Sequence, residues 1–381
     1  MKIAIDATSM LLPGMGVRTY IHYWLASLLD AARLRGDAIA TYTPGMVVPH
    51  VLDHLKSSAG RSATQLRLRT VQLLNAISQA ENILLNPFML RAHVFHCSQH
   101  TMNVPIKKRV AATVFDLSCW KAPQYHTARN IAVTRRYGEV VLRRCDGVIA
   151  ISEHTRQDAI DILGISADRI RVIYPGVAEE FFEVTADNSA DVRARYRLNA
   201  PYLLFAGCIE PRKNVSTILR AFRDLRHSRR GDVQLVLAGN FGWANEETKT
   251  ALTKCGAGIR YLGYVPEKDM PGLFLGAAAL VYPSFYEGFG LPVVQAMAAG
   301  TPVITSNNSC LPEVTGEAAI HINPDSVEDL RAAMDRVLSD TELARTLSCR
   351  GKHRARRFHW AQNAIESLDF FHHCAGQPNR R

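Results

Sequence analysis

Short apolar runs that alternate with amphipathic stretches are the feature of this sequence that most restricts its fold. The first run, 2–6, is followed by a turn that contains Gly14 and Gly16 and then by apolar residues at helical spacing. A strand, a glycine loop and a helix in this order open a Rossmann-like unit. Strands of a parallel sheet are covered by helices on both faces and are therefore near-continuous apolar runs. The pattern predicts an α/β fold with parallel sheets.

This alternation occurs twice along the 381 residues, a length that suits two domains. Strands are expected at 2–6, 92–96, 110–115, 147–151 and 170–173, and again at 202–205, 233–237, 259–262, 279–281 and 302–304. Helices are expected at 132–144, 267–276, 291–299, 326–339 and 341–356. The stretch 178–200 breaks the pattern. We interpret it as the connection between a first domain, 1–177, and a second domain, 201–357.

Positive charge is concentrated in the first half of the chain. Residues 1–175 contain 21 Lys and Arg against 12 Asp and Glu, so this half carries nearly all of the net charge of +10. Such a surplus attracts phosphates, nucleic acid or an anionic membrane, and it is also compatible with a solvated basic face. Nucleic-acid binding would require aromatic residues interleaved with basic ones on one face. The sequence lacks that pattern, so we expect no nucleic-acid partner.

Cysteine usage and hydropathy indicate the compartment. The eight cysteines are scattered without a C-x-x-C pair, which argues against a structural zinc site and suits a reducing compartment. The first residues lack a signal-peptide pattern, and no apolar run approaches the roughly 20 residues that span a bilayer. We expect a cytoplasmic protein that is soluble, or peripheral at the inner face of the membrane.

The stretch 284–292 has the residue types of a sugar-binding loop. Gly288 and Gly290 allow a ligand to approach the backbone closely, and their N–H groups precede a predicted helix N-terminus. The carboxylate of Glu287 can accept hydrogen bonds from sugar hydroxyls and oppose positive charge at an anomeric carbon. A plain glycine loop with a surface glutamate would explain the glycine pair alone.

Two adjacent cations, Arg212 and Lys213, lie between a predicted strand and a predicted helix. This position suits a pyrophosphate, which Arg212 can bind bidentately and Lys213 as a point charge. Cations are disfavoured at a helix N-terminus, so function explains them better than chance exposure. Asp116, at the end of the strand 110–115, is a weaker candidate, because an aspartate there can also cap a turn.

These motifs resemble the retaining glycosyltransferases of family 4, the group 1 glycosyl transferases, which have the GT-B fold. Residues 287–291 match the first half of the family's Glu-x7-Glu signature, and Gln295 stands at its second acidic position. Residues 210–214 resemble the family's diphosphate-binding segment, which has this Glu-Pro-Arg-Lys-Asn form in mannosyltransferases of surface polysaccharide assembly. The resemblance covers nearly the whole chain and is loose over 47–91.

The resemblance implies two Rossmann-like domains that face a cleft, with a helix at about 358–381 that crosses back to the first domain. It implies transfer with retention of configuration and without a metal, since cations neutralise the leaving diphosphate. We expect a hexose, mannose from GDP-mannose, to be moved to a glycan or polyprenyl-diphosphate-linked acceptor in surface polysaccharide or lipopolysaccharide biosynthesis. No other cofactor is expected. The loose region, with Arg67 and Arg69, is where we expect contact with an anionic membrane.

The resemblance also implies site residues. The catalytic set is Glu287, Asp116, Arg212 and Lys213. The nucleotide-sugar set is Gly14, Gly16, Gly207, Arg212, Lys213, Gly239, Tyr264, Val265, Glu287, Gly288, Phe289, Gly290, Leu291 and Gln295. The acceptor set is His126, Ser152 and Glu153, of which the last two can equally cap the helix that follows. Phe115 stands where many relatives have histidine, so no catalytic histidine is expected there.

The sequence is also compatible with two alternatives. One is a hydrolysing sugar-nucleotide epimerase of GT-B fold, which needs acid and base carboxylates and lacks the 287–291 loop. The other is an inactive sugar-nucleotide-binding subunit, which the substitutions at Gln295 and Phe115 make conceivable. Arg212, Lys213 and Glu287 are all present, which argues against the inactive subunit.

Overall fold

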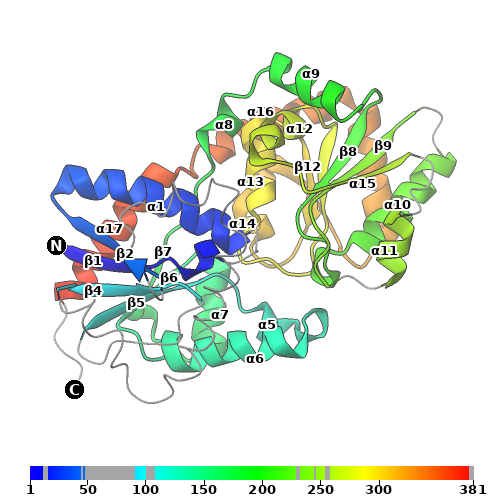
Figure 1. Cartoon of the computed structure of the whole chain (residues 1–381). Coiled ribbons are helices and arrows are strands. Elements are labelled where there is room, and N and C mark those ends of the chain that lie inside the picture. Colours follow the sequence, from blue (N-terminus) through cyan, green and yellow to red (C-terminus); the bar gives the residue numbers. More distant parts are fainter. Residues whose placement is uncertain are drawn as a thin grey trace. The chain divides into compact units, whose positions relative to one another are not determined.

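The computed structural model describes residues 1–11, 16–43, 46–47, 91–99, 108–228, 232–243, 246–253 and 258–376. Gly14, Arg67 and Arg69 lie outside these residues. The chain forms two compact units (Figure 1). The first comprises Met1–Lys121, Ala128–Gly176 and Trp360–Arg381, and the second comprises Ala122–Thr127 and Val177–His359.

The described residues of the first unit form a seven-stranded sheet in the order β3-β2-β1-β4-β5-β6-β7, parallel except for β3. The strands are β1 (Lys2–Asp6), β2 (Ala38–Thr43), β3 (Met46–Val47), β4 (Val94–Cys97), β5 (Arg109–Val114), β6 (Gly147–Ala150) and β7 (Ile170–Val172). The α-helices are α1 (Gly16–Arg35), α5 (Ser118–Lys121), α6 (Ala128–Tyr137), α7 (Glu153–Leu163) and α17 (Trp360–Gly376). Short 3-10 turns are η1 (Thr8–Leu11) and η4 (Ala167–Arg169), and η3 (Gly138–Leu142) is π-helical.

Strand β4 shows why this sheet is covered on both faces. Successive side chains of a strand point to opposite faces. Phe95 and Cys97 belong to the core on the side of η3 and α7. His96 points the other way, and its ring lies 4.8 Å from that of Trp24 in α1 and 5.7 Å from that of Phe371 in α17.

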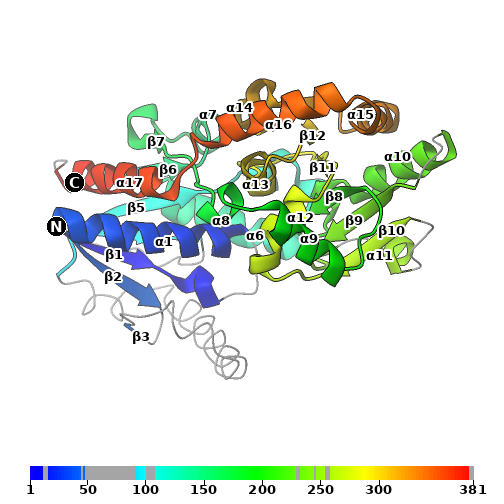
Figure 2. The same ribbon diagram turned by 90° about the horizontal axis from the view of Figure 1, so that it is seen from above.

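The C-terminal helix α17 is part of the first unit and lies beside α1 (Figure 2). Trp24 donates a hydrogen bond from Nε1 to Ser367 Oγ across the two helices, 3.0 Å. The predicted α/β class, with two parallel-sheet units and a C-terminal helix that returns to the first, is confirmed. Within the described residues, no helix combines the length and the apolar character needed to cross a membrane.

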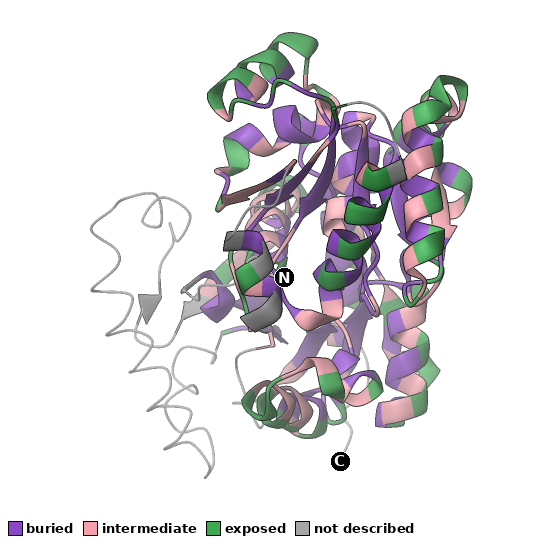
Figure 3. Ribbon diagram, turned by 90° about the vertical axis from the view of Figure 1, so that its right-hand side faces the viewer, coloured by how far each residue is buried: buried purple, intermediate pink, exposed green. Residues whose placement is uncertain are grey.

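The described residues of the second unit form a six-stranded parallel sheet in the order β10-β9-β8-β11-β12-β13. The strands are β8 (Tyr202–Ala206), β9 (Gln234–Ala238), β10 (Ile259–Gly263), β11 (Ala279–Tyr282), β12 (Val303–Ser306) and β13 (Ala319–Ile322). The α-helices are α8 (Glu179–Phe182), α9 (Ala186–Arg195), α10 (Val215–Ser228), α11 (Glu246–Thr253), α12 (Met270–Leu275), α13 (Leu291–Ala299), α14 (Leu311–Thr315), α15 (Val327–Ser339) and α16 (Thr341–Ala355). The 3-10 turns are η2 (Pro123–Tyr125), η5 (Pro211–Lys213), η6 (Glu267–Asp269) and η7 (Gly316–Ala318). The central strands of the sheet are buried between helices (Figure 3).

Some elements differ from the sequence prediction. The stretch 178–200 contains α8 and α9, and α9 packs closely on α12, where Gly272 leaves room for the backbone of Asn188. The predicted helix 132–144 begins earlier and becomes π-helical at Gly138, where a Cβ would lie 2.8 Å from Trp120. Strands β2, β3 and β13 were not predicted, because their residues lack a long apolar run.

Candidate active site

The second unit brings two predicted motifs together at one edge of its sheet. Strands β8 and β11 are parallel neighbours, so the segments that follow them meet at the same edge. Phe285, after β11, donates its N–H to the carbonyl of Arg212, after β8, at 2.9 Å. Asn214 has a left-handed φ of 58° and donates from Nδ2 to the carbonyls of Pro283 and Pro324, at 3.1 and 2.7 Å.

Glycines bring the ends of β8, β9 and β10 close together. Gly239 has a φ of 137°, and a Cβ there would lie 1.9 Å from the carbonyl oxygen of Gly207. Its N–H donates to Gly263 at 2.7 Å. No side chain fits at Gly239, because the backbone of Gly207 occupies that space. Tyr264 is 54% exposed and Val265 is buried.

A buried ionic cluster occupies this edge. Glu287 accepts a hydrogen bond from Lys213 Nζ at 2.5 Å and another from Arg212 Nη1 at 3.1 Å. Arg212 also donates from Nη2 to Glu210, 2.6 Å, and from Nη1 to the carbonyl of Tyr286, 2.6 Å. Two positive charges, the guanidinium of Arg212 and the ammonium of Lys213, are therefore balanced by two carboxylates, those of Glu210 and Glu287.

Tyr282, the last residue of β11, holds Lys213 from the other side. Lys213 Nζ donates to the hydroxyl oxygen of Tyr282 at 2.5 Å and lies 4.9 Å from the centre of its ring. Burial raises the pKa of Tyr282, and the negative charge of Glu287 raises it further, so the phenol stays protonated. Burial would also raise the pKa of Glu287, but the charges of Lys213 and Arg212 outweigh it and lower that pKa to about 2.

The loop that carries Glu287 is fixed from several sides. Ser309, which has a left-handed φ of 51°, accepts a hydrogen bond from the N–H of Glu287 at 3.2 Å. Cys310 donates from Sγ to the carbonyl of Glu287 at 3.1 Å. Gly290 has a φ of 88° and precedes α13, whose first turn contains Pro292. The carboxylate is thus presented on a rigid turn.

The remaining predicted residues of this loop have different environments. Phe289 is buried, and its ring lies edge-on to Phe358 at 5.4 Å. Gly288 is also buried, whereas Leu291 and Gln295 are half-buried in α13. The amide of Gln295 makes no hydrogen bond to another described residue and is available to a ligand.

The segment Ala122–Thr127 groups with the second unit. Tyr125 stacks on Phe285 with ring centres 4.7 Å apart and planes 5° apart. Its carbonyl accepts a hydrogen bond from Trp243 Nε1 at 2.7 Å, and the ring of His126 lies 6.0 Å from that of Trp243. Phe285 precedes Glu287 by two residues, so the stacking contact holds Tyr125 beside the loop that carries Glu287. His126 is the next residue along the chain.

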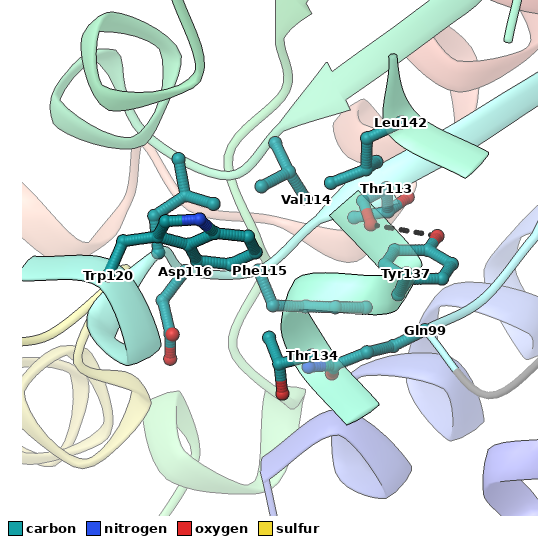
Figure 4. A pocket seen from close by; sticks show the side chains of 10 residues that line it. Gln99, Thr113, Val114, Phe115, Asp116, Trp120, Thr134, Tyr137 and Leu142 are labelled. Carbon is teal, nitrogen blue, oxygen red and sulfur yellow. Dashed lines mark hydrogen bonds between the residues drawn. The ribbon is translucent and has the colours of Figure 1, made fainter. Parts of the chain in front are cut away.

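Asp116 lies in the first unit and helps to line a small pocket (Figure 4). Its Oδ1 accepts hydrogen bonds from the N–H and the hydroxyl of Ser118, at 3.0 and 2.6 Å. Asp116 therefore caps the turn into α5, and within the described residues its second oxygen accepts no hydrogen bond. Phe115 is buried, and its ring is edge-on to Tyr20 at 5.0 Å.

The other predicted residues of the first unit either cap a helix or are exposed to solvent. Ser152 is fully buried and caps α7 by accepting a hydrogen bond from the N–H of Thr155, 3.0 Å. Glu153 is exposed and pairs with Arg156 at 3.5 Å. Gly16 is exposed at the start of α1.

The sequence analysis did not identify Glu210 and Tyr282, which contact the cations, or Ser309, which binds the backbone of Glu287. Glu210 belongs to the segment 210–214, whose resemblance to a diphosphate-binding segment pointed to this part of the chain. Its hydrogen bond with Arg212 could be known only from the fold. No group of three or more His, Cys, Asp or Glu side chains in the described residues is arranged to hold a metal ion. The charges that such a site would need at this edge are already paired with Arg212 and Lys213.

Two family models match the chain. Glycosyl transferases group 1 matches residues 190–354, and Glycosyltransferase Family 4 matches residues 90–181. O-antigen chain mannosyltransferase B of Escherichia coli is 31% identical over 268 residues, which are 69% of this chain and 70% of that protein. Serotype-specific mannosyltransferase WbdA of Escherichia coli is 30% identical over 60% of this chain, which spans only 29% of its length.

Solved structures share the fold. Sucrose-phosphate synthase of Thermosynechococcus elongatus has a TM-score of 0.72 at 20% identity, with 98% of each chain covered. HepE of Anabaena, solved with UDP and glucose, has a TM-score of 0.69 at 16% identity, with 97% of this chain and 98% of that chain covered. These neighbours confirm the GT-B fold class.

Proposed function

We propose that this chain, which belongs to glycosyltransferase family 4, transfers mannose from GDP-mannose to a glycan or lipid-linked glycan in surface polysaccharide biosynthesis. The family makes it a glycosyltransferase. The names of the two Escherichia coli relatives support mannose as the sugar and the O-antigen as the kind of product.

The observation that carries the proposal is the buried cluster of Glu287, Lys213, Arg212 and Glu210. A nucleoside diphosphate leaves with negative charge, and two fixed cations in a water-poor site stabilise that charge strongly. In the proposed reaction Arg212 and Lys213 take the diphosphate without a metal. Glu287, ionised because of its low pKa, accepts hydrogen bonds from donor hydroxyls. The departing phosphate oxygen accepts the proton of the acceptor, which attacks from the same face.

The donor nucleotide is tested by thermal shift with GDP, UDP and dTDP. A ligand at 100 times its dissociation constant stabilises the folded state by about 2.7 kcal/mol. We expect GDP to raise the melting temperature most. A larger shift with UDP or dTDP would replace GDP in the proposal.

The reaction is tested with GDP-mannose and a lipid-linked glycan acceptor. We expect an α-linked product, the configuration of the donor, by NMR of the isolated glycan, and a rate unchanged by EDTA. Donor without acceptor should stay intact. An epimer formed from donor alone would support the epimerase instead.

A further inference from the structure

The segment Ala122–Thr127 groups with the second unit although the chain on both sides of it belongs to the first. It directly follows α5 and directly precedes α6. Both helices are fixed within the first unit. Lys121 of α5 pairs with buried Asp158 of α7 at 3.1 Å, and Arg135 of α6 donates to the carbonyl of Cys119 at 3.1 Å. The two ends of the segment are therefore joined to anchored helices.

The segment itself is a short turn that is closed by its own hydrogen bonds. The N–H groups of Tyr125 and His126 donate to the carbonyls of Ala122 and Pro123, at 3.1 and 3.0 Å. Pro123 begins η2, and the ring of a proline fixes its φ. The turn therefore presents the ring of Tyr125 with little backbone freedom.

Tyr125 contacts the loops that follow two strands of the second unit. Its ring stacks on Phe285, after β11, and its carbonyl accepts the hydrogen bond of Trp243, after β9. The strand order β9-β8-β11 places the loop of β8, which carries the two proposed diphosphate-binding cations, between them. The loop after β9 is also fixed, because Gly242 donates its N–H to the carbonyl of Ile209 at 3.0 Å. Tyr125 thus joins the two loops on either side of the cations.

Phe285 is the residue through which this contact reaches both motifs of the site. Its N–H donates to the carbonyl of Arg212 at 2.9 Å, and its carbonyl accepts a hydrogen bond from Asn308 Nδ2 at 3.0 Å. Glu287 follows along the same loop. A stacked aromatic pair stabilises the arrangement of its two rings beyond the effect of area burial. A shift of Phe285 would therefore displace the backbone of Arg212 and the carboxylate of Glu287.

We propose that Tyr125 is a positioning residue for sugar transfer: its ring holds Phe285, and thereby the loop of Glu287, in the arrangement that the reaction needs. The inference rests on the proposed function, which assigns Glu287 to the donor sugar. Misplacement of a group at the reacting centre by about 1 Å can lower a rate about 100-fold. Diphosphate binding depends less on the stack, because both cations keep partners outside this loop.

Tyr125→Ala and Tyr125→Phe in the whole protein test the proposal. Initial rates are measured with the sugar donor of the nucleotide that gives the largest thermal shift. We expect kcat to fall about tenfold or more in the alanine variant and to stay near the wild-type value in the phenylalanine variant, which keeps the stacked ring. The dissociation constant of the nucleotide should change little in either. A purely structural role would lower the melting temperature and leave kcat of the folded protein unchanged.

Phe285→Ala completes a double-mutant cycle with Tyr125→Ala. If the two rings act as one contact, the double variant should lose no more kcat than the more affected single variant. Gln124→Ala is the matched control, because Gln124 is exposed in the same turn and its loss leaves both rings in place. This control should transfer sugar at the wild-type rate.

Hydrogen exchange measured by mass spectrometry reports on the loop without sugar transfer. In Tyr125→Ala the amides of residues 284–290 should exchange about two- to tenfold faster, the range expected from loss of a stacked pair. The buried strand β8 should keep its slow exchange. Unchanged exchange in the loop, or unchanged kcat in Tyr125→Ala, would overturn the proposal. A wild type that transfers no sugar would instead overturn the proposed function, and the exchange rates would then decide whether Tyr125 holds the loop.

Discussion

At the scale of single residues, the candidate site is a set of buried charges that pair with one another. Arg212 is held by Glu210 and Glu287, and Lys213 by Glu287 and Tyr282. A buried charge without a partner is costly, so this pairing keeps both cations in place. A diphosphate then meets cations that need little reorganisation.

Lys213→Ala should lower kcat/KM at least tenfold and weaken binding of nucleoside diphosphates. The change removes one of the two proposed diphosphate contacts and leaves Glu287 with one cation. Initial rates and calorimetric titration with GDP measure both effects. Arg223→Ala, an exposed cation of α10, should leave both unchanged. Normal kinetics in the Lys213 variant would remove that residue from the site.

Glu287 should make the second unit less stable in acid. Its pKa is lowered from 4.5 to about 2, because the two cations outweigh burial. Since the folded-state pKa is the lower one, the stabilisation is complete above the unfolded-state value and is lost as pH falls from about 4.5 towards 2. The full contribution is about 3 kcal/mol.

Urea unfolding at a series of pH values measures this effect. Glu287→Gln should be less stable at neutral pH, because Lys213 is left without a carboxylate and Arg212 keeps only Glu210. The stability of the variant should also change less between about pH 5 and pH 3. If the wild type and the variant lost the same stability over that interval, the carboxyl would not be held in its charged form.

At the scale of elements, the turn from β11 into α13 decides where Glu287 stands. Gly290 has a φ of 88°, a conformation that costs residues with a Cβ about 1–2 kcal/mol. A Cβ there would also lie 3.0 Å from Leu311. The turn therefore requires glycine for both its backbone and its packing.

Gly290→Ala should lower stability by about 1–2 kcal/mol and also weaken donor binding. Gly164→Ala is a matched control, because Gly164 has a φ of 64° at the end of α7 with open space around it. The control should lose similar stability and keep its affinity for GDP. Chemical denaturation and titration separate the two effects. Equal affinities in both variants would show that the turn does not position the donor site.

The sequence predicts elements well where its apolar runs are long. Buried strands such as β8 and β11, and the loops after them, follow from the pattern, and so does the residue set of 287–291. β13 (Ala319–Ile322) escaped prediction because its side chains are mostly half-buried at the sheet edge. The contact between Tyr282 and Lys213 escaped for another reason: 69 residues separate the partners, and only the pairing of β8 with β11 joins them.

At the scale of the whole molecule, each unit has its own core. Phe371 of α17 is fully buried in the first unit, and Phe222 of α10 is fully buried in the second. Truncation of a buried phenylalanine to alanine costs about 3–5 kcal/mol. Substitution at either position should therefore lower the free energy of unfolding of one unit by a similar amount.

Phe371→Ala should lower the melting temperature of the first unit, and Phe222→Ala that of the second. Scanning calorimetry with and without GDP identifies the second unit as the transition that the nucleotide raises. We expect GDP to stabilise the Phe371 variant as much as the wild type. A loss of the GDP effect in that variant would mean that the units do not unfold separately.

The chain leaves the first unit and returns to it at adjacent places. Val177 donates its N–H to the carbonyl of Phe358 at 2.9 Å, and it forms a bridge with His359. Residues 177–359 are thus an insertion whose two ends meet, an arrangement that tolerates exchange of whole domains. Two recombination events, one at each end, would therefore replace the whole second unit, which carries the proposed donor site. New combinations of donor and acceptor can arise in this way, provided that the segment 122–127 still fits its partner.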